Sequence, residues 1–257
     1  MQQGKDVIGL SAGEPDFETP RHIREAAIDA INSGDTKYTA VDGTLDLKRA
    51  VAKKFRTENG LKYQPDQILV SSGAKQVCYN ACQALLGKGD EAVIPAPYWV
   101  SYPDMVRLAG ADPVIVRTDN ETGFRMSRAQ LAGALTERTR ALIINSPCNP
   151  TGSAYSRSDW QSLGEILREY PKVFVITDDI YEHIYWGAEP FCSFLEACPE
   201  FYNRTLTVNG VSKGYAITRR PGGYAGGPAE LIKAMKSIQS QSTTNACTIS
   251  QLSLIHI

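Results

Sequence analysis

Lys213 is the side chain of this sequence best suited to act as a nucleophile. The β-branched run 205–208 predicts a buried strand that ends at Asn209 and Gly210, just before Ser212 and Lys213. A lysine beyond a buried strand faces a cleft, and partial burial lowers the pKa of its ammonium group. The free amine can then add to an aldehyde. On residue type alone, an ordinary solvated loop lysine is the simpler interpretation.

Two acidic residues, Asp178 and Asp179, end another apolar run in the segment ITDDIYEH. Paired carboxylates could bind a metal ion, but hard cations need several oxygen ligands, and the sequence offers no others nearby. We therefore expect no metal here. We expect the neighbouring Glu182 and His183 to lie at the surface or to support a site from behind.

Three loops carry further candidate groups. The segment SSGAKQ, residues 71–76, links a predicted strand to a predicted helix, whose first-turn N–H groups and positive end favour a phosphate. The segments PAPYWVSYP and NSPCNPTG, which begin at residues 95 and 145, each follow another predicted strand. Taken singly, these loops are more simply explained as a plain turn, a packed aromatic and a Pro-Gly turn.

The order of elements predicts how these loops are positioned. From residue 67 onward, short apolar runs alternate with helical periods, which is typical of crossover units on a mainly parallel sheet. A doubly wound α/β domain of this kind binds its ligands at the carboxyl ends of the strands. An additional short strand is expected at 6–10. The strands expected in the sheet are 68–71, 92–95, 113–116, 141–145, 173–177, 206–208 and 223–225.

The expected helices follow from capping residues and apolar spacing. One helix has Thr19 as N-cap and Pro20 at its first position, with Ile23, Ala27, Ala30 and Ile31 on its apolar face. The other expected helices begin at Thr44, with Leu47, Val51 and Phe55 on one face, and at 228, or span 74–86, 127–135 and 158–169.

Composition excludes several classes of protein. The chain has 27 basic and 28 acidic residues among 257, so no net field favours nucleic acid or an anionic membrane. The six cysteines form no C-x-x-C pair, and the three histidines form no ligand cluster with them. No window approaches a membrane span, and no export signal is evident. We expect a cytoplasmic enzyme without structural zinc.

The segment VNGVSKGYAITRRPGGYAGGP, residues 208–228, resembles the pyridoxal-phosphate lysine segment of class I aminotransferases, the aspartate aminotransferase family. That family's pattern is S-K-x-[FY]-[AS]-M-T-G-W-R-x-G-Y. The family's phosphate-binding arginine falls at Pro221, after Arg219 and Arg220. One of these arginines replaces it, cofactor binding is weaker, or the local sequence is faulty. The matching residues are Ser212, Lys213, Tyr215, Ala216, Thr218, Gly223, Tyr224 and Gly227.

The resemblance implies a role for each motif. It makes Lys213 the lysine joined to the aldehyde of pyridoxal 5'-phosphate, Asp178 the partner of the ring nitrogen, and Tyr181 a ligand of the phenolic oxygen; these three are the catalytic residues. Trp99 would stack on the ring and Asn149 would bind the phenolic oxygen. The resemblance implies that the cofactor phosphate is bound by Gly73, Ala74, Lys75 and Ser212. It also implies that Tyr38 reaches the phosphate of a neighbouring subunit.

The resemblance also implies substrate contacts and backbone geometry. Gly13, Trp99 and Asn149 match substrate-binding positions of the family. Cis peptide bonds are expected at Ala96-Pro97 and Asn149-Pro150. The implied protein is a homodimer when full length.

The resemblance covers residues 4–251 and implies an aminotransferase of fold type I. We expect a large cofactor-binding domain at 18–251, incomplete at its C-terminus, a segment 1–17 on the small-domain side, and a small domain that is largely missing. Residues 252–257, LSLIHI, match a translated transposase adapter and are expected to be an artefact.

The implied reaction moves an amino group from an amino acid to a 2-oxoacid, with aspartate and 2-oxoglutarate as the expected pair. The family's α-carboxylate arginine lies in the missing small domain, so we expect this chain to be poorly active or inactive. Two alternatives stay open. One is another fold-type I enzyme, such as a different aminotransferase or a β-lyase, because cofactor motifs do not choose the substrate. The other is a catalytically silent cofactor-binding fragment.

Overall fold

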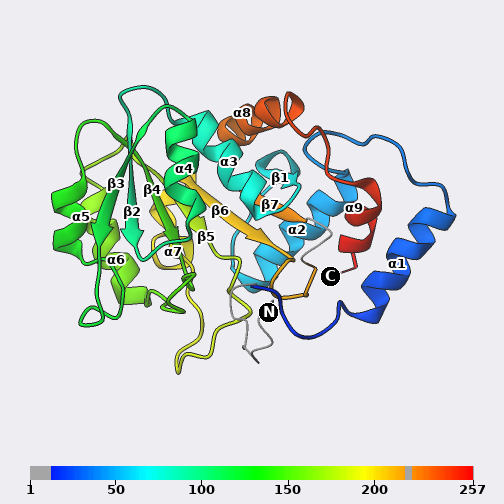
Figure 1. Ribbon diagram of the computed structural model, residues 1–257, viewed down its shortest axis with the longest axis horizontal. Helices are drawn as coiled ribbons and strands as arrows, with labels where there is room; N and C mark the ends of the chain where they lie inside the picture. The colour runs from blue at the N-terminus through cyan, green and yellow to red at the C-terminus, as the bar shows by residue number, and fades with distance from the viewer. Residues whose placement is uncertain (1–12, 218–221, 257) are drawn as a thin grey trace, which may run out of the picture.

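The computed structural model describes residues 13–217 and 222–256. Within these ranges, seven strands form one sheet in the order β1-β7-β6-β5-β4-β2-β3 (Figure 1). Strand β7 is antiparallel to both neighbours, and every other pair is parallel. The prediction of a mainly parallel seven-stranded sheet is confirmed. The strands are β1 Ile68–Ser71, β2 Glu91–Ala96, β3 Asp112–Arg117, β4 Thr139–Asn145, β5 Phe174–Asp178, β6 Thr205–Gly210 and β7 Gly223–Gly226.

Helices cover both faces of the sheet, because successive side chains of each strand point to opposite faces. Leu142 and Ile144 of β4 pack into one core cluster with α2, α5, α6 and α7, whereas Ile143 packs into another with α3, α4 and α8. The helices are α1 Arg21–Asn32, α2 Leu45–Glu58, α3 Ala74–Leu85, α4 Ser101–Leu108, α5 Arg128–Ala134, α6 Arg157–Leu167, α7 Phe194–Ala197, α8 Ala229–Ser240 and α9 Thr248–Leu254, with short 3-10 turns at Pro65–Gln67 and Pro199–Arg204.

The expected helix starts are right or nearly right. Thr44 caps α2 by accepting a hydrogen bond from the Leu47 amide. Helix α1 begins one residue late, with Pro20 as its N-cap. Ile31 is 49 % exposed, so its expected place on the apolar face of α1 is wrong. The cause is helical geometry, since Ile31 lies about 80° around the helix from Ile23 at 3.6 residues per turn.

Helix α4 was not expected, because the segment PAPYWVSYP, which includes Pro103, was interpreted as a loop. Proline is tolerated in the first turn of a helix, where its missing N–H has no intrahelical partner. Pro103 is the third residue of α4, and Tyr102, Met105 and Val106 of this helix are buried. The oversight matters because α4 carries a side chain of the candidate site.

The first and last helices of the described chain are neighbours. Helices α1 and α9 pack against each other at the β1 end of the molecule (Figure 1). Leu254 of α9 is buried in the core, and the adapter origin of 252–257 stays a prediction. The strand expected at 6–10 lies outside the described residues. Among the residues that the structure describes, no helix is both long and apolar enough to span a bilayer.

Candidate functional site

A cavity of about 260 Å³ opens at the carboxyl ends of the parallel strands. This is the edge where the fold predicts a ligand. The loops that follow β1, β2, β4, β5 and β6 all reach it. Nine of the residues predicted from the sequence line the cavity, namely Gly73, Ala74, Lys75, Trp99, Asn149, Asp178, Tyr181, Ser212 and Lys213. Four lining residues were not predicted: Ser72, Tyr102, Asn145 and Ile180.

The amino end of α3 forms one wall of the cavity. Gly73 is its N-cap, with φ +95°, a backbone conformation that favours glycine. Because glycine has no side chain, none at the N-cap competes with an anion for the first-turn N–H groups. Lys75 Nζ lies 5.0 Å from the centroid of the Trp99 ring. The wall can therefore bind a phosphate beside an aromatic face.

Asp178, the last residue of β5, is 4 % exposed. Its Oδ2 accepts a hydrogen bond from the Tyr102 hydroxyl at 2.7 Å, and its Oδ1 accepts one from the Ile180 amide at 3.3 Å. Burial raises the pKa of Asp178, while these two hydrogen bonds oppose the rise. The Asp178 carboxylate is thus shielded from water and held in place by two hydrogen-bond donors. A carboxylate of this kind is suited to pair with a protonated nitrogen of a ligand.

Tyr102 is the most consequential residue that sequence reasoning missed. It is 2 % exposed and packs edge-on against Trp99, with 5.3 Å between ring centroids. Tyr102 lies within the predicted loop segment PAPYWVSYP, but nothing in that segment indicates that a helix turns its hydroxyl back toward β5. A prediction of helix α4 would have placed Tyr102 on a buried helical face and indicated its contact with the site.

Lys213 lies in the turn after β6, where its Nζ donates a hydrogen bond to the Gly13 carbonyl oxygen at 2.6 Å. The same nitrogen is 5.6 Å from the centroid of the Tyr181 ring. Partial burial lowers the pKa of Lys213, and Glu14 opposes that effect. The chain thus brings Gly13, 200 residues away in sequence, to the amine of Lys213.

Two asparagines tie the loop after β4 to the site. Asn149 Nδ2 lies 3.5 Å from the Tyr181 hydroxyl, at the limit of a hydrogen bond. Asn145 accepts from the Asn149 amide at 2.7 Å and donates to the Asp178 carbonyl oxygen at 2.7 Å. Asn145 was not predicted as a site residue, although its position at the end of a strand, inside the motif NSPCNPTG, could have indicated it.

The expected cis peptide bonds at Ala96-Pro97 and Asn149-Pro150 are present, with an unexpected third at Ser146-Pro147.

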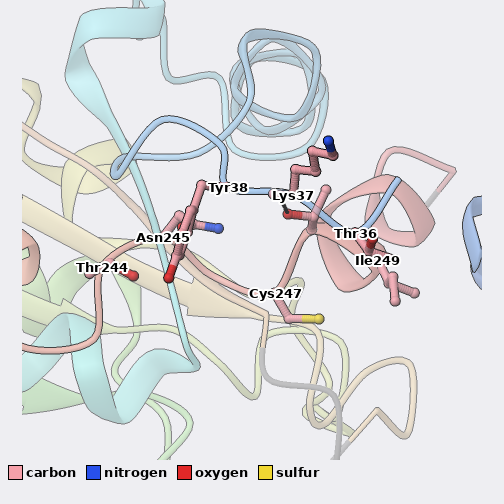
Figure 2. A pocket seen from close by; sticks show the side chains of 8 residues that line it. Thr36, Lys37, Tyr38, Thr244, Asn245, Cys247 and Ile249 are labelled. Carbon is pink, nitrogen blue, oxygen red and sulfur yellow. Dashed lines mark hydrogen bonds between the residues drawn. The ribbon is translucent and has the colours of Figure 1, made fainter. Parts of the chain in front are cut away.

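Tyr38 does not line this cavity. It is 91 % exposed and lies at a separate open groove of about 590 Å³ (Figure 2). A residue assigned to a neighbouring subunit's phosphate has to lie outside its own chain's cavity, as Tyr38 does. The groove is lined by Thr36, Lys37, Tyr38, Thr244, Asn245, Cys247, Thr248 and Ile249.

The predicted role of Arg219 or Arg220 in place of an arginine at Pro221 falls on residues outside the described ranges.

Known proteins resemble this chain over nearly its whole length. An aspartate/prephenate aminotransferase from Cereibacter sphaeroides is 56 % identical over 248 residues, which are 96 % of this chain and 62 % of that protein. An aspartate aminotransferase from Rhizobium meliloti is 52 % identical over 250 residues, 97 % of this chain and 61 % of that protein. This chain therefore spans about three fifths of the length of these curated relatives.

Solved structures agree with the sequence matches. The crystal structure of an aspartate aminotransferase from Rhizobium meliloti superposes with a TM-score of 0.96 at 51 % identity, covering 99 % of this chain and 64 % of that one. An aspartate aminotransferase from Thermus thermophilus, solved with maleate, gives a TM-score of 0.94 at 45 % identity, covering 99 % and 65 %. The family of class I and II aminotransferases matches residues 5–257. This chain belongs to that family.

Proposed function

We propose that the protein to which this chain belongs is a pyridoxal-phosphate-dependent aminotransferase. It moves the amino group of an amino acid to 2-oxoglutarate, and aspartate is the amino acid that we propose. The observation that carries the proposal is one cavity that joins an amine of lowered pKa at Lys213, a buried carboxylate at Asp178 and the amino end of α3. Family membership supports the same conclusion.

The residues around the cavity fit this cofactor in the chemistry of their groups. The phosphate would bind at the amino end of α3, near Lys75 and the Ser212 hydroxyl. The ring nitrogen would meet Asp178, and Trp99 offers a flat face for the ring. When bound, the cofactor supplies an aldehyde that combines with amines and a ring that accepts the electron pair of a broken substrate bond.

The side chains of this chain then act on protons and charge. Partial burial lowers the pKa of Lys213, which increases the share of its amine in the free, basic form; that form would take the proton from the α-carbon of an amino acid. Asp178 would keep a proton on the ring nitrogen, and the Tyr102 hydroxyl stabilises the charge of Asp178. Asn149 and Tyr181 would orient the cofactor's phenolic oxygen.

Aspartate as the substrate is supported by the names of the relatives. The Rhizobium meliloti relative is an aspartate aminotransferase, and the Cereibacter sphaeroides relative is an aspartate/prephenate aminotransferase. A structural neighbour from Pyrococcus horikoshii, 38 % identical, is an aromatic aminotransferase, which keeps a different amino acid as the runner-up. A β-lyase and a silent cofactor-binding fragment are the remaining alternatives.

We also propose a homodimer and a cytoplasmic location for the full-length protein. The exposed Tyr38, placed outside its own cavity, supports a dimer in which it reaches the partner's site. Five cysteines, Cys78, Cys82, Cys148, Cys192 and Cys198, are buried or half-buried thiols outside any disulfide bond, which suits a reducing compartment.

Absorption spectroscopy tests the proposal. The purified chain is mixed with pyridoxal 5'-phosphate, and aspartate is then added; Lys213→Ala is the control. We expect an absorption band from cofactor joined covalently to Lys213. This band should be absent from the Lys213→Ala variant and should shift when aspartate is added. A static band supports a silent cofactor-binding protein instead, and the absence of any band in the wild-type chain contradicts both interpretations.

A further inference from the structure

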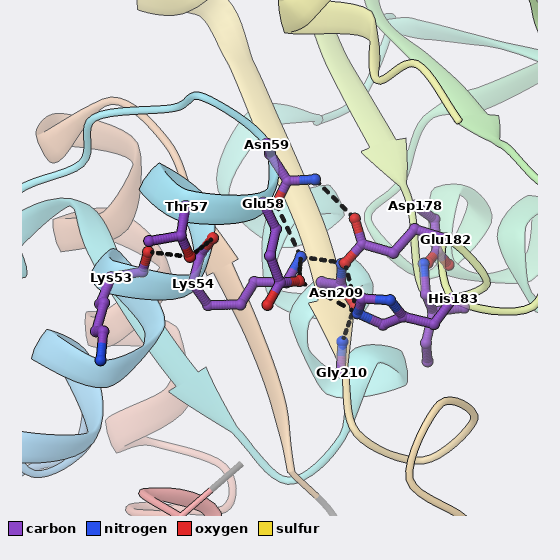
Figure 3. Close-up of polar contacts among 11 residues, drawn as sticks. Lys53, Lys54, Thr57, Glu58, Asn59, Asp178, Glu182, His183, Asn209 and Gly210 are labelled. Carbon is purple, nitrogen blue, oxygen red and sulfur yellow. Dashed lines mark hydrogen bonds and ion pairs between the residues drawn. The ribbon is translucent and has the colours of Figure 1, made fainter. Parts of the chain in front are cut away.

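Glu182 is a buried carboxylate that follows Tyr181 of the candidate site, and Figure 3 shows its polar contacts. Only 4 % of its side chain is exposed, so the expectation of a surface residue is wrong and that of a supporting residue remains. Its Oε1 accepts a hydrogen bond from Asn209 Nδ2 at 2.7 Å, and its Oε2 accepts one from Asn59 Nδ2 at 2.7 Å. Lys54 of α2 forms an ion pair with Oε1.

The charge of Glu182 is balanced within the chain. An isolated buried carboxylate is strongly unfavourable, whereas a paired and hydrogen-bonded one is tolerated. The ammonium group of Lys54, whose side chain is 15 % exposed, supplies the opposite charge and also donates to Asn59 Oδ1 at 2.8 Å. Glu182 thus has a cationic partner and two amide donors.

The same contacts argue against a metal ion at this position. Ligand atoms of Glu58, Glu182 and His183 lie within 4.8 Å of one another, a spacing that could hold a cation. Lys54 Nζ, however, pairs with Glu182 and is 3.5 Å from Glu58 Oε2. The chain's own ammonium group therefore occupies the position where these carboxylates converge.

Glu182 connects two segments of the candidate site. It follows Tyr181 directly, and its amide donates to the Asp179 carbonyl oxygen at 2.9 Å, which closes the turn after Asp178. On the other side, Asn209 donates to Glu182 and accepts from the Gly210 amide at 2.7 Å. Gly210 is three residues before Lys213.

This side-chain bond extends a connection that the sheet provides only in part. Paired residues of β5 and β6 run as far as Asp178 and Val208, and the Asp179 amide donates to the Val208 carbonyl oxygen at 2.9 Å. Tyr181 and Lys213 both lie beyond that point. The bond between Glu182 and Asn209 joins the loop after β5 to the last residues of β6, which precede Lys213.

We propose that Glu182 is a positioning residue which, through Asn209, holds the Lys213 segment in register with the loop that carries Asp178 and Tyr181. The inference rests on the proposed function for its purpose but not for its test. Lys54 is part of the same device, because without it the carboxylate would be a buried unpaired charge.

The position of Lys213 can be measured without cofactor. Trace acetic anhydride labels amines at a rate that depends on pH and surroundings, and peptide mass spectrometry isolates Lys213, with the exposed Lys88 as internal reference. Asn209→Ala removes the link and leaves the pair of Glu182 and Lys54 intact. We expect the labelling midpoint of Lys213 to move upward, because a loosened segment is more solvated.

Glu182→Gln, which keeps the shape of the side chain, is the second variant and decides the matter if Asn209→Ala does not fold. A change in Lys213 labelling is expected here too. The matched control is Glu91→Gln. Glu91 is also a buried carboxylate, with 6 % of its side chain exposed and paired with Arg138. It is the first residue of β2 and so lies at the amino end of that strand, whereas the cavity lies at the carboxyl ends. This control should label Lys213 as the wild type does.

Cofactor titration of the same proteins separates the two proposals. Both test variants should bind pyridoxal 5'-phosphate about tenfold more weakly than wild type, because Asn209→Ala removes the hydrogen bond to the charged carboxylate and Glu182→Gln removes the charge that strengthens it. Wild-type labelling of Lys213 in the deciding variant, or unchanged cofactor affinity, overturns the positioning role. A wild-type chain that shows the expected labelling but binds no cofactor contradicts the proposed function alone.

Discussion

The hydroxyl of Tyr102 donates a hydrogen bond to Oδ2 of Asp178 across 2.7 Å, inside a region where both residues are almost completely buried. Burial raises the pKa of Tyr102 well above that of an ordinary tyrosine, so the phenol keeps its proton and remains a donor. Because Tyr102 also packs edge-on against Trp99, a single helical residue links the aromatic wall of the cavity to its acid.

Tyr102→Phe removes this donor and preserves the ring. Burial already raises the pKa of Asp178, and the Tyr102 hydrogen bond opposes that rise, so the variant should raise it further. Binding of pyridoxal 5'-phosphate should weaken about tenfold at neutral pH. As pH falls, binding should also be lost at a higher pH than in the wild type. Fluorescence titration from pH 5 to 8 measures both effects, and superimposable pH profiles would contradict the proposed link.

The adjacent acids Asp178 and Asp179 offer a matched pair of variants. Both are buried, but only Asp178 lines the cavity. Burial, with Glu182 and Asp178 nearby, raises the pKa of Asp179 well above its usual range, so this carboxyl favours its protonated form more than an ordinary aspartate does.

Asp178→Asn should therefore weaken cofactor binding by at least about tenfold, since it removes the charge that faces the ring nitrogen. Asp179→Asn changes a carboxyl that does not line the cavity and should leave the dissociation constant unchanged. Equilibrium dialysis of the two variants against pyridoxal 5'-phosphate makes the comparison. Equal losses in both would mean that the effect comes from general damage at the end of β5.

The sequence predicted the sheet well because of how a doubly covered parallel sheet is built. Strands buried on both faces appear as apolar runs, and β4, with Ala141, Leu142, Ile143 and Ile144 all buried, is such a run. The position of the cavity followed from the same topology. Residues directly after a strand, such as Lys213 and Asn149, could therefore be assigned to one site before any coordinates.

The parts that escaped prediction depend on contacts between distant segments. The hydrogen bond between Tyr102 and Asp178 spans 76 residues of sequence. It depends on helix α4, which was not expected in a segment that contains Pro103. The ion pair of Lys54 and Glu182 spans 128 residues. A charged residue next to an active-site motif looks solvated in sequence, because burial of charge is decided by a partner that the local pattern does not contain.

A second buried charge cluster stabilises the fold in a pH-dependent way. Asp42 pairs with Lys48 at 2.6 Å and with Lys236 at 2.9 Å, which joins α2 and α8. Burial raises the pKa of Asp42, but hydrogen bonds from the two lysines outweigh it, and the net pKa is lowered. The unfolded chain therefore binds this proton more readily, and the stabilisation is present above about pH 4 and lost as pH falls below it.

Asp42→Asn should lower the free energy of unfolding by about 3 kcal/mol at pH 7, since it leaves a buried lysine without its counterion. The difference from wild type should shrink toward pH 3. Urea unfolding at the two pH values measures it. Asp46→Asn is the control, because Asp46 and Arg49 form an exposed pair that contributes less than about 1 kcal/mol. A pH-independent difference would show that the charge of Asp42 is not the cause.

Gly223 of β7 lies against the turn that opens α3, so this glycine is required by close packing. A Cβ atom there would lie 2.1 Å from the Gly73 carbonyl carbon and 2.2 Å from the Ala74 nitrogen, which are backbone atoms that cannot turn aside. Gly223→Ala should push the strand away from the proposed phosphate wall. We expect a loss of about 1–3 kcal/mol in the free energy of unfolding and weaker cofactor binding.

The control for this substitution is Gly133→Ala in α5, where an added Cβ would meet nothing within 4 Å. Alanine is favoured over glycine in a helix, so this variant should gain up to about 1 kcal/mol. Urea unfolding midpoints and phosphate-dependent cofactor affinity, compared between pyridoxal and pyridoxal 5'-phosphate, separate the two effects. If Gly223→Ala binds both forms as the wild type does, the turn at Gly73 does not hold the phosphate.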